Sequence, residues 1–505
     1  SRGFRPPYGG SMSFILNQVR KSLFLDSVML MQVSRSVAAL PGVQEAALMM
    51  GTPANQQILN DSNLLGSEGK KAEGGDLIVA VRADDEASAA TAIEQSALFL
   101  TSPVASSRTG EANNPRTLRS ALQLNPKANI ALISVPGDFA SAEARKALRA
   151  GLHVMIFSDN VSLEEEIAIK REASDSNLLV MGPDCGTALI GGTPLGFCNR
   201  VPTGDIGIIG ASGTGIQEVS CLIAKGGGGI SHAIGVGGRD LSDEVGGIST
   251  LSAIQWLESD PKTRHIVLIS KPPSTLVAEK IVERLRDTQK SATVCFFGAQ
   301  DLELPAKIVG ARTLRATAAN ALGSKESIFG QFDIARKVTS DRKWIRGLFS
   351  GGSLAAEAQV IFLDQGFEVM SNAPIFAKNM FREGVPGHTL LDLGDDQYTR
   401  GRPHPMIDPA VRDEPFRKAL DDNEVGVILL DIVIGFGSCA DPASQVVQVL
   451  DKHQHHDPIV VASVTGTEDD PQVLSRQVAI LESAGVSVAP SNAHAVETAL
   501  VSISS

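Results

Sequence analysis

Short apolar runs alternate with amphipathic stretches along almost the whole chain, and this alternation predicts α/β domains. In the first segment it predicts strands over residues 14–19, 44–50 and 77–81 and a helix over residues 26–39. These elements form a small α/β domain of their own. Turn-forming residues without an apolar period fill residues 104–118, so we expect a linker or loop and a domain boundary there.

A second alternating unit follows this boundary. Residues 128–135 form a continuous apolar run, which is typical of a buried parallel strand, and a helix is expected over residues 141–150. A strand over residues 153–157, a helix that begins after Ser162 and a strand over residues 178–181 continue the pattern. Open α/β sheets bind ligands at the carboxyl ends of their strands, so the loops after these strands are candidate binding loops.

A strand, a glycine-rich turn and a helix start follow one another directly in residues 206–218. Gly213 and Gly215 let the backbone approach a ligand, while Ser212 and Thr214 offer hydroxyls that can cap the helix and bind oxygen atoms. The helix N-terminus adds the positive end of its dipole. The turn therefore predicts a phosphate or carboxylate site, with a plain strand-to-helix turn as the alternative.

A later segment repeats this plan. Residues 348–357 again run from a strand through a glycine-rich turn into a helix, with Gly351, Gly352 and Ser353 in the turn. Because two such turns occur in one chain, anion binding is favoured over turn geometry alone for both of them.

Four further residues directly follow predicted strands and carry groups that suit an anionic ligand. Gly238 and Arg239 offer a close backbone approach and a guanidinium, Lys271 offers an ammonium, and Asp184 lies in a ligand-facing loop. A surface lysine at the end of a strand is the alternative interpretation for Lys271.

The loop over residues 392–408 is dense in polar groups. Arg400 and Arg402 can each bind a carboxylate or a phosphate through a planar fork, and His404 can transfer a proton. The alternative is a salt-bridged connection in which the aspartates of the loop neutralise the arginines. The same aspartates also suit Mg²⁺, but without a companion carboxylate motif we expect no metal site.

The composition of the chain excludes several classes of binding partner. The chain has 505 residues and a formal charge of −12, and it has no long basic run, so non-specific nucleic-acid binding is excluded. Its five cysteines are scattered without a C-x-x-C pair, which argues against a disulfide framework or a structural zinc site. No apolar run approaches the length of a spanning helix, so we expect a cytoplasmic protein that does not bind membranes.

Several motifs resemble the α subunit of succinyl-CoA synthetase, in order and with similar intervals. The turn at residues 350–353 is similar to the ligase domain of the β subunit of that enzyme. The α-subunit motifs are Ala131-Leu-Ile-Ser-Val-Pro-Gly-Asp-Phe139, Leu179-Val-Met-Gly-Pro-Asp-Cys-Gly186, Gly210-Ala-Ser-Gly-Thr-Gly215 and Gly235-Val-Gly-Gly-Arg-Asp240.

Other segments resemble the FdrA family, across essentially all of residues 13–500. They are Met49-Met-Gly-Thr-Pro-Ala-Asn55, Ser158-Asp-Asn-Val161, Gly401-Arg-Pro-His-Pro-Met-Ile-Asp-Pro409 and Val464-Thr-Gly-Thr-Glu468. The resemblance implies a multidomain α/β protein. Residues 1–11 are expected to be a cloning remnant, 12–103 a small N-terminal α/β domain, 119–200 a Rossmann-like CoA-binding-type domain, and 201–338 and 339–505 two flavodoxin-like, succinyl-CoA synthetase-like domains.

The FdrA resemblance implies a subunit of a carbamoyltransferase. In this reaction phosphate attacks the carbamoyl carbon of oxalurate (carbamoyl-oxamate) or a similar ureido acid, giving oxamate and carbamoyl phosphate in purine and allantoin nitrogen catabolism. We expect His404, Arg402 and Lys271 to be catalytic and the two turns to bind phosphate or substrate. The alternatives are an NDP-forming, succinyl-CoA synthetase-like acyl-CoA synthetase and a non-catalytic subunit of a larger complex.

The chain departs from the synthetases at two places. The extra N-terminal domain stands where the synthetases have the glycine-rich loop for CoA, and residues 295–300 have no histidine where the synthetases carry phosphate on one. We therefore expect no bound cofactor, with phosphate as a substrate and CoA binding in doubt. Co-encoded protein subunits are the expected partners, and a homo-oligomer is left open.

Overall fold

The computed structural model divides into two compact units. One unit comprises Ser1–Thr117 with Arg400–Pro403, and the other comprises Leu118–Thr399 with His404–Ser505. The structure describes residues 13–25, 27–101, 115, 117–299, 302–333, 338, 341–399, 403–453 and 458–503.

The first unit is a three-stranded antiparallel sheet in the order β1-β3-β2, with helices on both faces. Aliphatic side chains of α1 and α3 cover one face, and α2 covers the other. The strands expected at residues 14–19, 44–50 and 77–81 are confirmed. The elements are β1 (Phe14–Arg20), α1 (Ser27–Ala38), β2 (Val43–Met50), α2 (Pro53–Asp61), β3 (Leu77–Ala83) and α3 (Glu86–Thr101).

The second unit begins with a small parallel sheet, β4-β5-β6. The hydroxyl of Ser162 accepts a hydrogen bond from Glu165 N at 3.3 Å and caps α6, as expected. The helix expected at residues 141–150 instead begins at Gly137, directly after Pro136, whose fixed backbone angle suits the start of a helix. The elements are α4 (Leu118–Leu124), β4 (Ile130–Ile133), α5 (Gly137–Arg149), β5 (His153–Ile156), α6 (Leu163–Asp175) and β6 (Val180–Met181).

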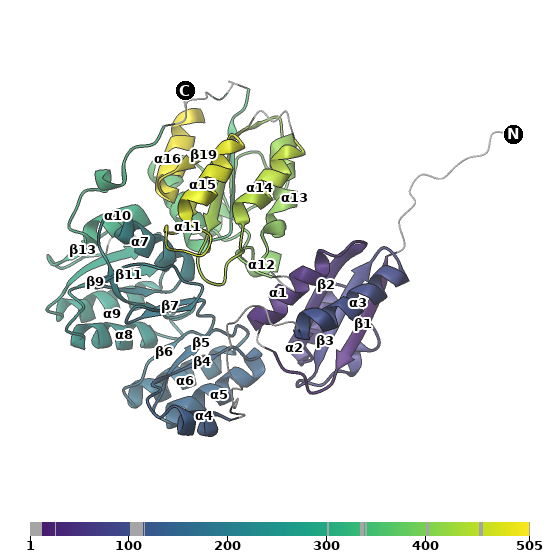
Figure 1. The fold of residues 1–505 in the computed structure, drawn as a ribbon. Helices are drawn as coiled ribbons and strands as arrows, with labels where there is room; N and C mark the ends of the chain where they lie inside the picture. The colour runs from purple at the N-terminus through teal and green to yellow at the C-terminus, as the bar shows by residue number, and fades with distance from the viewer. Residues whose placement is uncertain are drawn as a thin grey trace. The chain divides into compact units, whose positions relative to one another are not determined.

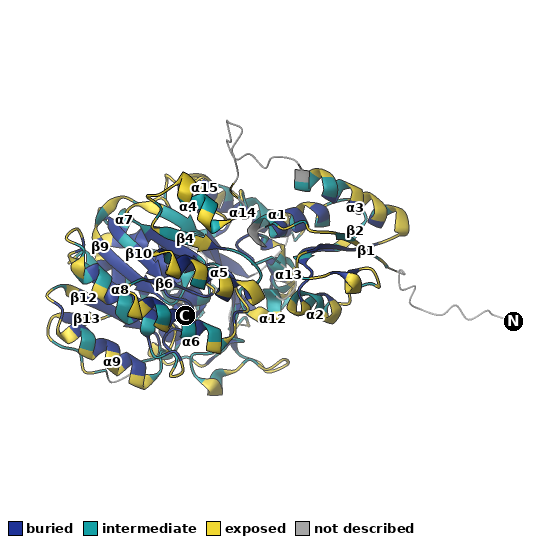
Figure 2. Ribbon diagram, turned by 90° about the horizontal axis from the view of Figure 1, so that it is seen from below, coloured by how far each residue is buried: buried dark blue, intermediate teal, exposed yellow. Residues whose placement is uncertain are grey.

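A seven-stranded sheet follows, in the order β13-β12-β11-β9-β10-β7-β8. Helices α7 and α10 pack on one face and α8 and α9 on the other (Figure 1), so its central strands are buried (Figure 2). The elements are β7 (Thr187–Ile190), β8 (Thr193–Gly196), β9 (Thr203–Gly210), α7 (Gly213–Lys225), β10 (Ile230–Gly235), α8 (Ile248–Ser259), β11 (His265–Ser270), α9 (Thr275–Arg286), β12 (Ser291–Phe296), β13 (Ile308–Gly310) and α10 (Leu314–Ala321).

A six-stranded parallel sheet, β15-β16-β14-β17-β18-β19, completes the unit. Helices α11 and α16 lie on one face and α13, α14 and α15 on the other, so the expected multidomain α/β class is confirmed. The elements are β14 (Trp344–Phe349), α11 (Gly352–Asp364), β15 (Val369–Met370), β16 (His388–Asp392), α12 (Asp396–Thr399), α13 (Asp413–Asp421), β17 (Val425–Val433), α14 (Pro442–Asp451), β18 (Ile459–Thr465), α15 (Leu474–Ser483), β19 (Ser487–Ala489) and α16 (Asn492–Ile503), with 3-10 turns such as η4 (Pro409–Arg412) between them.

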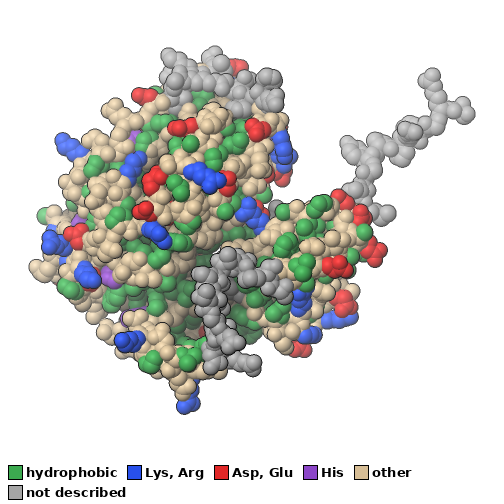
Figure 3. Space-filling model, in the orientation of Figure 1, with side chains coloured by type: hydrophobic (Ala, Val, Ile, Leu, Met, Phe, Trp, Pro, Cys, Tyr) green, Lys and Arg blue, Asp and Glu red, His purple; other side chains and the backbone are tan. Residues whose placement is uncertain are grey.

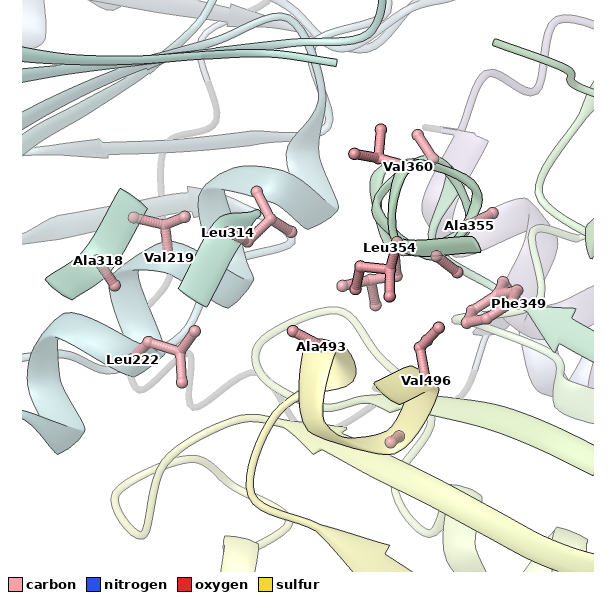
Figure 4. Packing of buried hydrophobic residues seen from close by; sticks show 14 of the residues in the cluster. Val219, Leu222, Leu314, Ala318, Phe349, Leu354, Ala355, Val360, Ala493 and Val496 are labelled. Atoms are coloured by element: carbon pink, nitrogen blue, oxygen red, sulfur yellow. The ribbon is translucent and has the colours of Figure 1, made fainter. Parts of the chain in front are cut away.

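The two large sheets share one hydrophobic core. Helix α7 packs against α10 and α11, and α11 packs against α16. Figure 4 shows this junction, in which Val219 and Leu222 of α7 face Leu314 and Ala318 of α10, while α11 and α16 pack beside them. Removing these aliphatic side chains from water stabilises the junction by about 25 cal/mol for each Å² of apolar surface. The junction therefore fixes α7 and α11 relative to each other.

A buried ion network joins the small parallel sheet to the seven-stranded sheet. Lys170 on α6 is 1% exposed. Its Nζ lies 2.8 Å from Glu166 Oε1, 2.8 Å from Asp240 Oδ1 and 3.1 Å from the carbonyl oxygen of Val236. The other oxygen of Asp240 accepts hydrogen bonds from the amide and the hydroxyl of Thr250, and the other oxygen of Glu166 lies 2.8 Å from the Arg239 guanidinium.

No helix in the described ranges combines the length and the apolar character needed to cross a bilayer. On the face drawn in Figure 3, acidic and basic side chains are interspersed and form no continuous basic surface.

We expect Lys170→Met to destabilise the second unit by about 3–5 kcal/mol, because Glu166 and Asp240 would keep buried charges without their shared cation. Urea unfolding followed by circular dichroism would measure the loss. Lys146→Met is the matched control, since Lys146 is 60% exposed and pairs with Glu143 at the surface, and it should change stability by less than about 1 kcal/mol. Equal effects of both variants would contradict the role of the network.

Candidate functional site

The two glycine-rich turns face each other across the junction of α7 and α11. A Cβ atom at Gly351 would lie 3.0 Å from Oγ1 of Thr214, and a Cβ at Gly215 would lie 3.0 Å from Oγ of Ser353. Each hydroxyl thus reaches the start of the opposite helix, and a Cβ at either glycine would crowd that hydroxyl. The structure therefore brings the two predicted cradles together into one site.

Both helices begin without a side-chain cap, as α5, α8, α13 and α15 also do. Ser212 is the N-cap residue of α7, but its hydroxyl makes no capping hydrogen bond, so the expected cap is absent; Gly351 precedes α11. By contrast, Ser162, Ser274 and Thr313 cap α6, α9 and α10. The positive ends of the α7 and α11 dipoles are therefore left for another acceptor.

Two buried hydroxyls at this site have no hydrogen-bond partner among the described residues. Thr214 is 7% exposed and Ser353 is fully buried, yet neither Thr214 Oγ1 nor Ser353 Oγ has an acceptor or a donor there. Buried polar groups are nearly always paired, so unpaired hydroxyls beside uncapped helix ends indicate a site for a ligand with oxygen acceptors.

A buried carboxylate holds the second turn in place. Asp431 on β17 accepts hydrogen bonds from the backbone amides of Ser350 and Gly351, each at 2.7 Å. Arg412, which is 4% exposed, donates to Asp431 at 2.7 Å and also to the Ser350 hydroxyl. Burial raises the pKa of Asp431, and Arg412 opposes this rise. The amides of Gly352 and Ser353 then remain for a ligand.

A lysine and an aspartate stand at the start of α11. Lys271 Nζ lies 3.3 Å from Asp392 Oδ2, and a Cβ at Gly352 would lie 2.5 Å from each of these two atoms. The side chain of Lys271 is 47% exposed and that of Asp392 is 4% exposed. Burial raises the pKa of Asp392, while Lys271 opposes the rise. Lys271 is thus a half-exposed cation beside the turn, as expected from its place after a strand.

His404 lies beside the same turn. Its Nε2 would be 2.6 Å from a Cβ at Gly394, and its Nδ1 accepts a hydrogen bond from Met406 N at 3.2 Å. Burial lowers the pKa of His404 to about 4, so the ring is neutral at physiological pH. With Nδ1 accepting, the proton of the neutral ring is on Nε2, which makes it a hydrogen-bond donor. Its role in proton transfer stays a prediction.

Asp184 and Arg239 form the next polar group along the sheet. Partial removal from water and the charges of Asp159 and Asp396 raise the pKa of Asp184 to about 7, while Arg239 and Lys271 oppose the rise. The Asp184 side chain keeps an exposed surface, so water limits this shift. Arg239 donates to the Val161 carbonyl and pairs with Glu166 at 2.8 Å, so its guanidinium is partly engaged. Gly238 lies near Ala211 in the first turn.

Other candidates are placed as follows. Arg400 and Arg402 lie outside the described residues. Burial raises the pKa of Cys185 to about 12, so this thiol is not a nucleophile. Among the residues that the structure describes, no group of three or more His, Cys, Asp or Glu side chains is placed to hold a metal ion.

Sequence reasoning did not single out Asp431 and Arg412. One signal was present, because Asp431 is the single charged residue within an otherwise apolar strand, residues 427–434. A charge in a buried strand is unusual unless it is paired, so it marks a position with a specific partner.

We expect Thr214→Val to leave the stability of the second unit unchanged within about 1 kcal/mol, because the hydroxyl that it removes has no hydrogen-bond partner in the part of the chain that the structure describes. Thr465→Val is the matched control, since the Thr465 hydroxyl donates to buried Glu218, and it should cost about 1–3 kcal/mol. Thermal unfolding would measure both. A large loss for Thr214→Val would show that its hydroxyl is paired within the protein.

The stability of the second unit should depend on Glu357 between acid and neutral pH. Burial and the nearby Glu218 raise the pKa of Glu357 from 4.5 to about 7. Since the folded state holds the proton more tightly, stability is highest below the unfolded pKa and falls as pH rises through the folded pKa. Glu357→Gln should remove about 1–3 kcal/mol of this loss between about pH 5 and 8, as measured by unfolding at several pH values. Exposed Glu368→Gln should keep the wild-type slope.

Three family models match the chain. Residues 12–116 match a model described as AllF, heavy metal-associated domain, residues 202–299 match a CoA binding domain, and residues 348–502 match CoA-ligase. Residues 12–116 contain neither cysteine nor histidine, so they do not fit a thiolate or imidazole metal site.

Two curated relatives are subunits of CoA ligases. The ADP-forming sulfoacetate-CoA ligase subunit SauD of Bilophila wadsworthia is 30% identical over 170 residues, covering 32% of this chain and 56% of that subunit. Succinate–CoA ligase [ADP-forming] subunit alpha 1 of Archaeoglobus fulgidus is 27% identical over 187 residues, covering 36% of this chain and 62% of that subunit. The chain thus spans only part of the length of each. The resemblance to the synthetase α subunit is confirmed.

These matches correct the expected activity. The prediction of a carbamoyltransferase acting on oxalurate is wrong, because two of the three family models, CoA binding domain and CoA-ligase, and both of these relatives point to CoA ligases. The fold is of the acyl-CoA synthetase type, similar to succinyl-CoA synthetase. The matches therefore favour the alternative prediction of an acyl-CoA synthetase over the carbamoyltransferase. A third relative, described as "Uncharacterized protein YahF" of Escherichia coli K12, is 40% identical over 501 residues, covering 94% of this chain and 96% of that protein. The chain therefore belongs to the family of YahF.

Proposed function

We propose that this chain performs the acyl-transfer stage of an NDP-forming acid–CoA ligase, exchanging an acyl group between the sulfur of CoA and a phosphate. The phosphate binds between the start of α7 and the start of α11. The observation that carries the proposal is the pair of facing, uncapped helix N-termini with unpaired hydroxyls at Thr214 and Ser353. The CoA-binding and CoA-ligase matches support the class of reaction.

The charges at the site suit this reaction. Phosphate oxygen attacks the thioester carbonyl, the C–O bond forms, the C–S bond breaks and CoA leaves as its thiol after taking up a proton. Lys271 supplies positive charge to the phosphate, and the helix amides of residues 213–215 and 352–353 supply donors. His404, as a neutral donor, is suited to stabilise the oxyanion that forms on the carbonyl.

The mechanism does not use a phosphorylated histidine at the end of β12. Residues 295–300 contain no histidine, so in this proposal the phosphate is held only by hydrogen bonds and charge. Arg239, Gly238 and Asp184 lie farther along the same strand ends, and we assign them to the acyl or CoA portion of the substrate. The division into a Rossmann-like domain at 119–200 and ligase-type domains at 201–338 and 339–505 is part of this proposal.

Partner subunits are expected to complete the enzyme. The sulfoacetate and succinate ligases with related sequences are described as subunits. We propose that a co-encoded subunit supplies the nucleotide step, in which the phosphoryl group of the acyl phosphate passes to a nucleoside diphosphate.

We expect this chain, alone or with its co-encoded partners, to release CoA from a short-chain acyl-CoA in a phosphate-dependent manner. A thiol reagent would measure the CoA, and hydroxylamine would trap the acyl phosphate. Lys271→Met should lower the rate by about 10²-fold, because one charge contact to the reacting phosphate is lost. Exposed Lys280→Met on α9 is the control and should keep the wild-type rate.

Absence of phosphate-dependent CoA release with every thioester and partner would exclude the proposed reaction. If phosphate still bound under those conditions, the chain would be a phosphate-binding subunit without catalysis.

A further inference from the structure

A carboxylate lies directly beside the anion site. Asp392 Oδ2 faces the first residue of α11, since a Cβ at Gly352 would lie 2.5 Å from it, and Lys271 Nζ lies 3.3 Å away. Asp392 Oδ1 accepts a hydrogen bond from Gly394 N at 3.0 Å. A carboxylate at this place repels a bound anion and weakens its binding, unless a proton is shared between the carboxylate and the anion.

The backbone of Asp392 is fixed. Its amide donates to Asn372 Oδ1 at 2.8 Å, and its carbonyl accepts from Asn372 Nδ2 at 2.9 Å. The side chain is 4% exposed and is held by Gly394 and Lys271. The carboxylate is thus built into the site at the end of β16 and is not a freely moving surface group.

An ionised carboxylate only accepts hydrogen bonds. Phosphate at neutral pH carries at least one P–OH proton and can donate it in a hydrogen bond, whereas sulfate has no proton and offers acceptors only. Facing the Asp392 carboxylate, sulfate has no proton to donate and meets a charge of its own sign. Sites built to pair with a particular proton reject analogues that lack it, because their own polar group is left unsatisfied.

We propose that Asp392 makes this site selective for oxyanions that carry a proton, so that it accepts phosphate and rejects sulfate. Asp392 Oδ2 accepts the P–OH hydrogen bond while Lys271 and the amides of Gly352 and Ser353 bind the charged oxygens. This inference rests on the anion site of the proposed function and adds to it the identity and protonation of the anion.

The test is titration calorimetry of the full chain with phosphate, arsenate and sulfate at equal ionic strength. Arsenate carries a proton at neutral pH, so it should bind like phosphate, while sulfate should bind at least about 100-fold more weakly. Asp392→Asn should bring sulfate to within about 10-fold of phosphate, because the amide of asparagine can donate to an oxyanion.

Asp395→Asn is the matched control. It removes the same charge from the same loop, and asparagine can replace the aspartate that accepts from Gln397 N at 3.1 Å. This variant should keep the wild-type preference for phosphate, which would separate the hydrogen bond of Asp392 from a general loss of negative charge.

The outcomes are distinct. Equal binding of sulfate and phosphate by the wild type would overturn the selectivity and leave the anion site standing. Binding of none of the three anions would overturn both the inference and the proposed function. A folded Asp392→Asn that still rejects sulfate would show that another group selects the anion. If that variant does not fold, the comparison of phosphate, arsenate and sulfate on the wild type decides.

Discussion

The packing of α7 against α11 is the constraint on which the rest of the site depends. Each helix starts at a glycine-rich turn that admits the hydroxyl of the other helix, Thr214 toward Gly351 and Ser353 toward Gly215. Two positive helix ends are thereby held close together, which is unfavourable in itself and requires a counter-charge. The continuous aliphatic core of α7, α10, α11 and α16 holds the helices in this arrangement.

The second turn is positioned by chemistry that differs from the first. Ala211 N, in the first turn, donates to the backbone carbonyl of Ile269 at 3.0 Å. At the corresponding place the second turn uses the Asp431 carboxylate, which itself needs Arg412 as a partner. Removing either Asp431 or Arg412 alone would leave the other as an unpaired buried charge and destabilise the protein. The geometry of the second turn therefore depends on both residues.

The sequence alone predicted what depends on local chemistry. The two turns and Lys271 were identifiable because glycine, hydroxyl and cation follow strands directly. The sequence did not show that the two turns face each other, because this arrangement arises from helix packing between residues about 140 positions apart in sequence. The start of α5 was predicted at residue 141, but the helix begins at Gly137, directly after Pro136. The sequence also did not distinguish carbamoyl transfer from acyl transfer, because both reactions need the same binding site for phosphate.

Asp431 accepts hydrogen bonds from the amides of Ser350 and Gly351, so these two amides of the second turn are not available to a ligand. The two turns share one plan but are chemically unequal, because the first turn uses Ala211 N for the Ile269 carbonyl, whereas the second uses two amides for the Asp431 carboxylate. In the proposed function, an oxyanion bound between the two turns would therefore meet different donors on its two sides. The shared plan of the two turns therefore does not make the space between them symmetric.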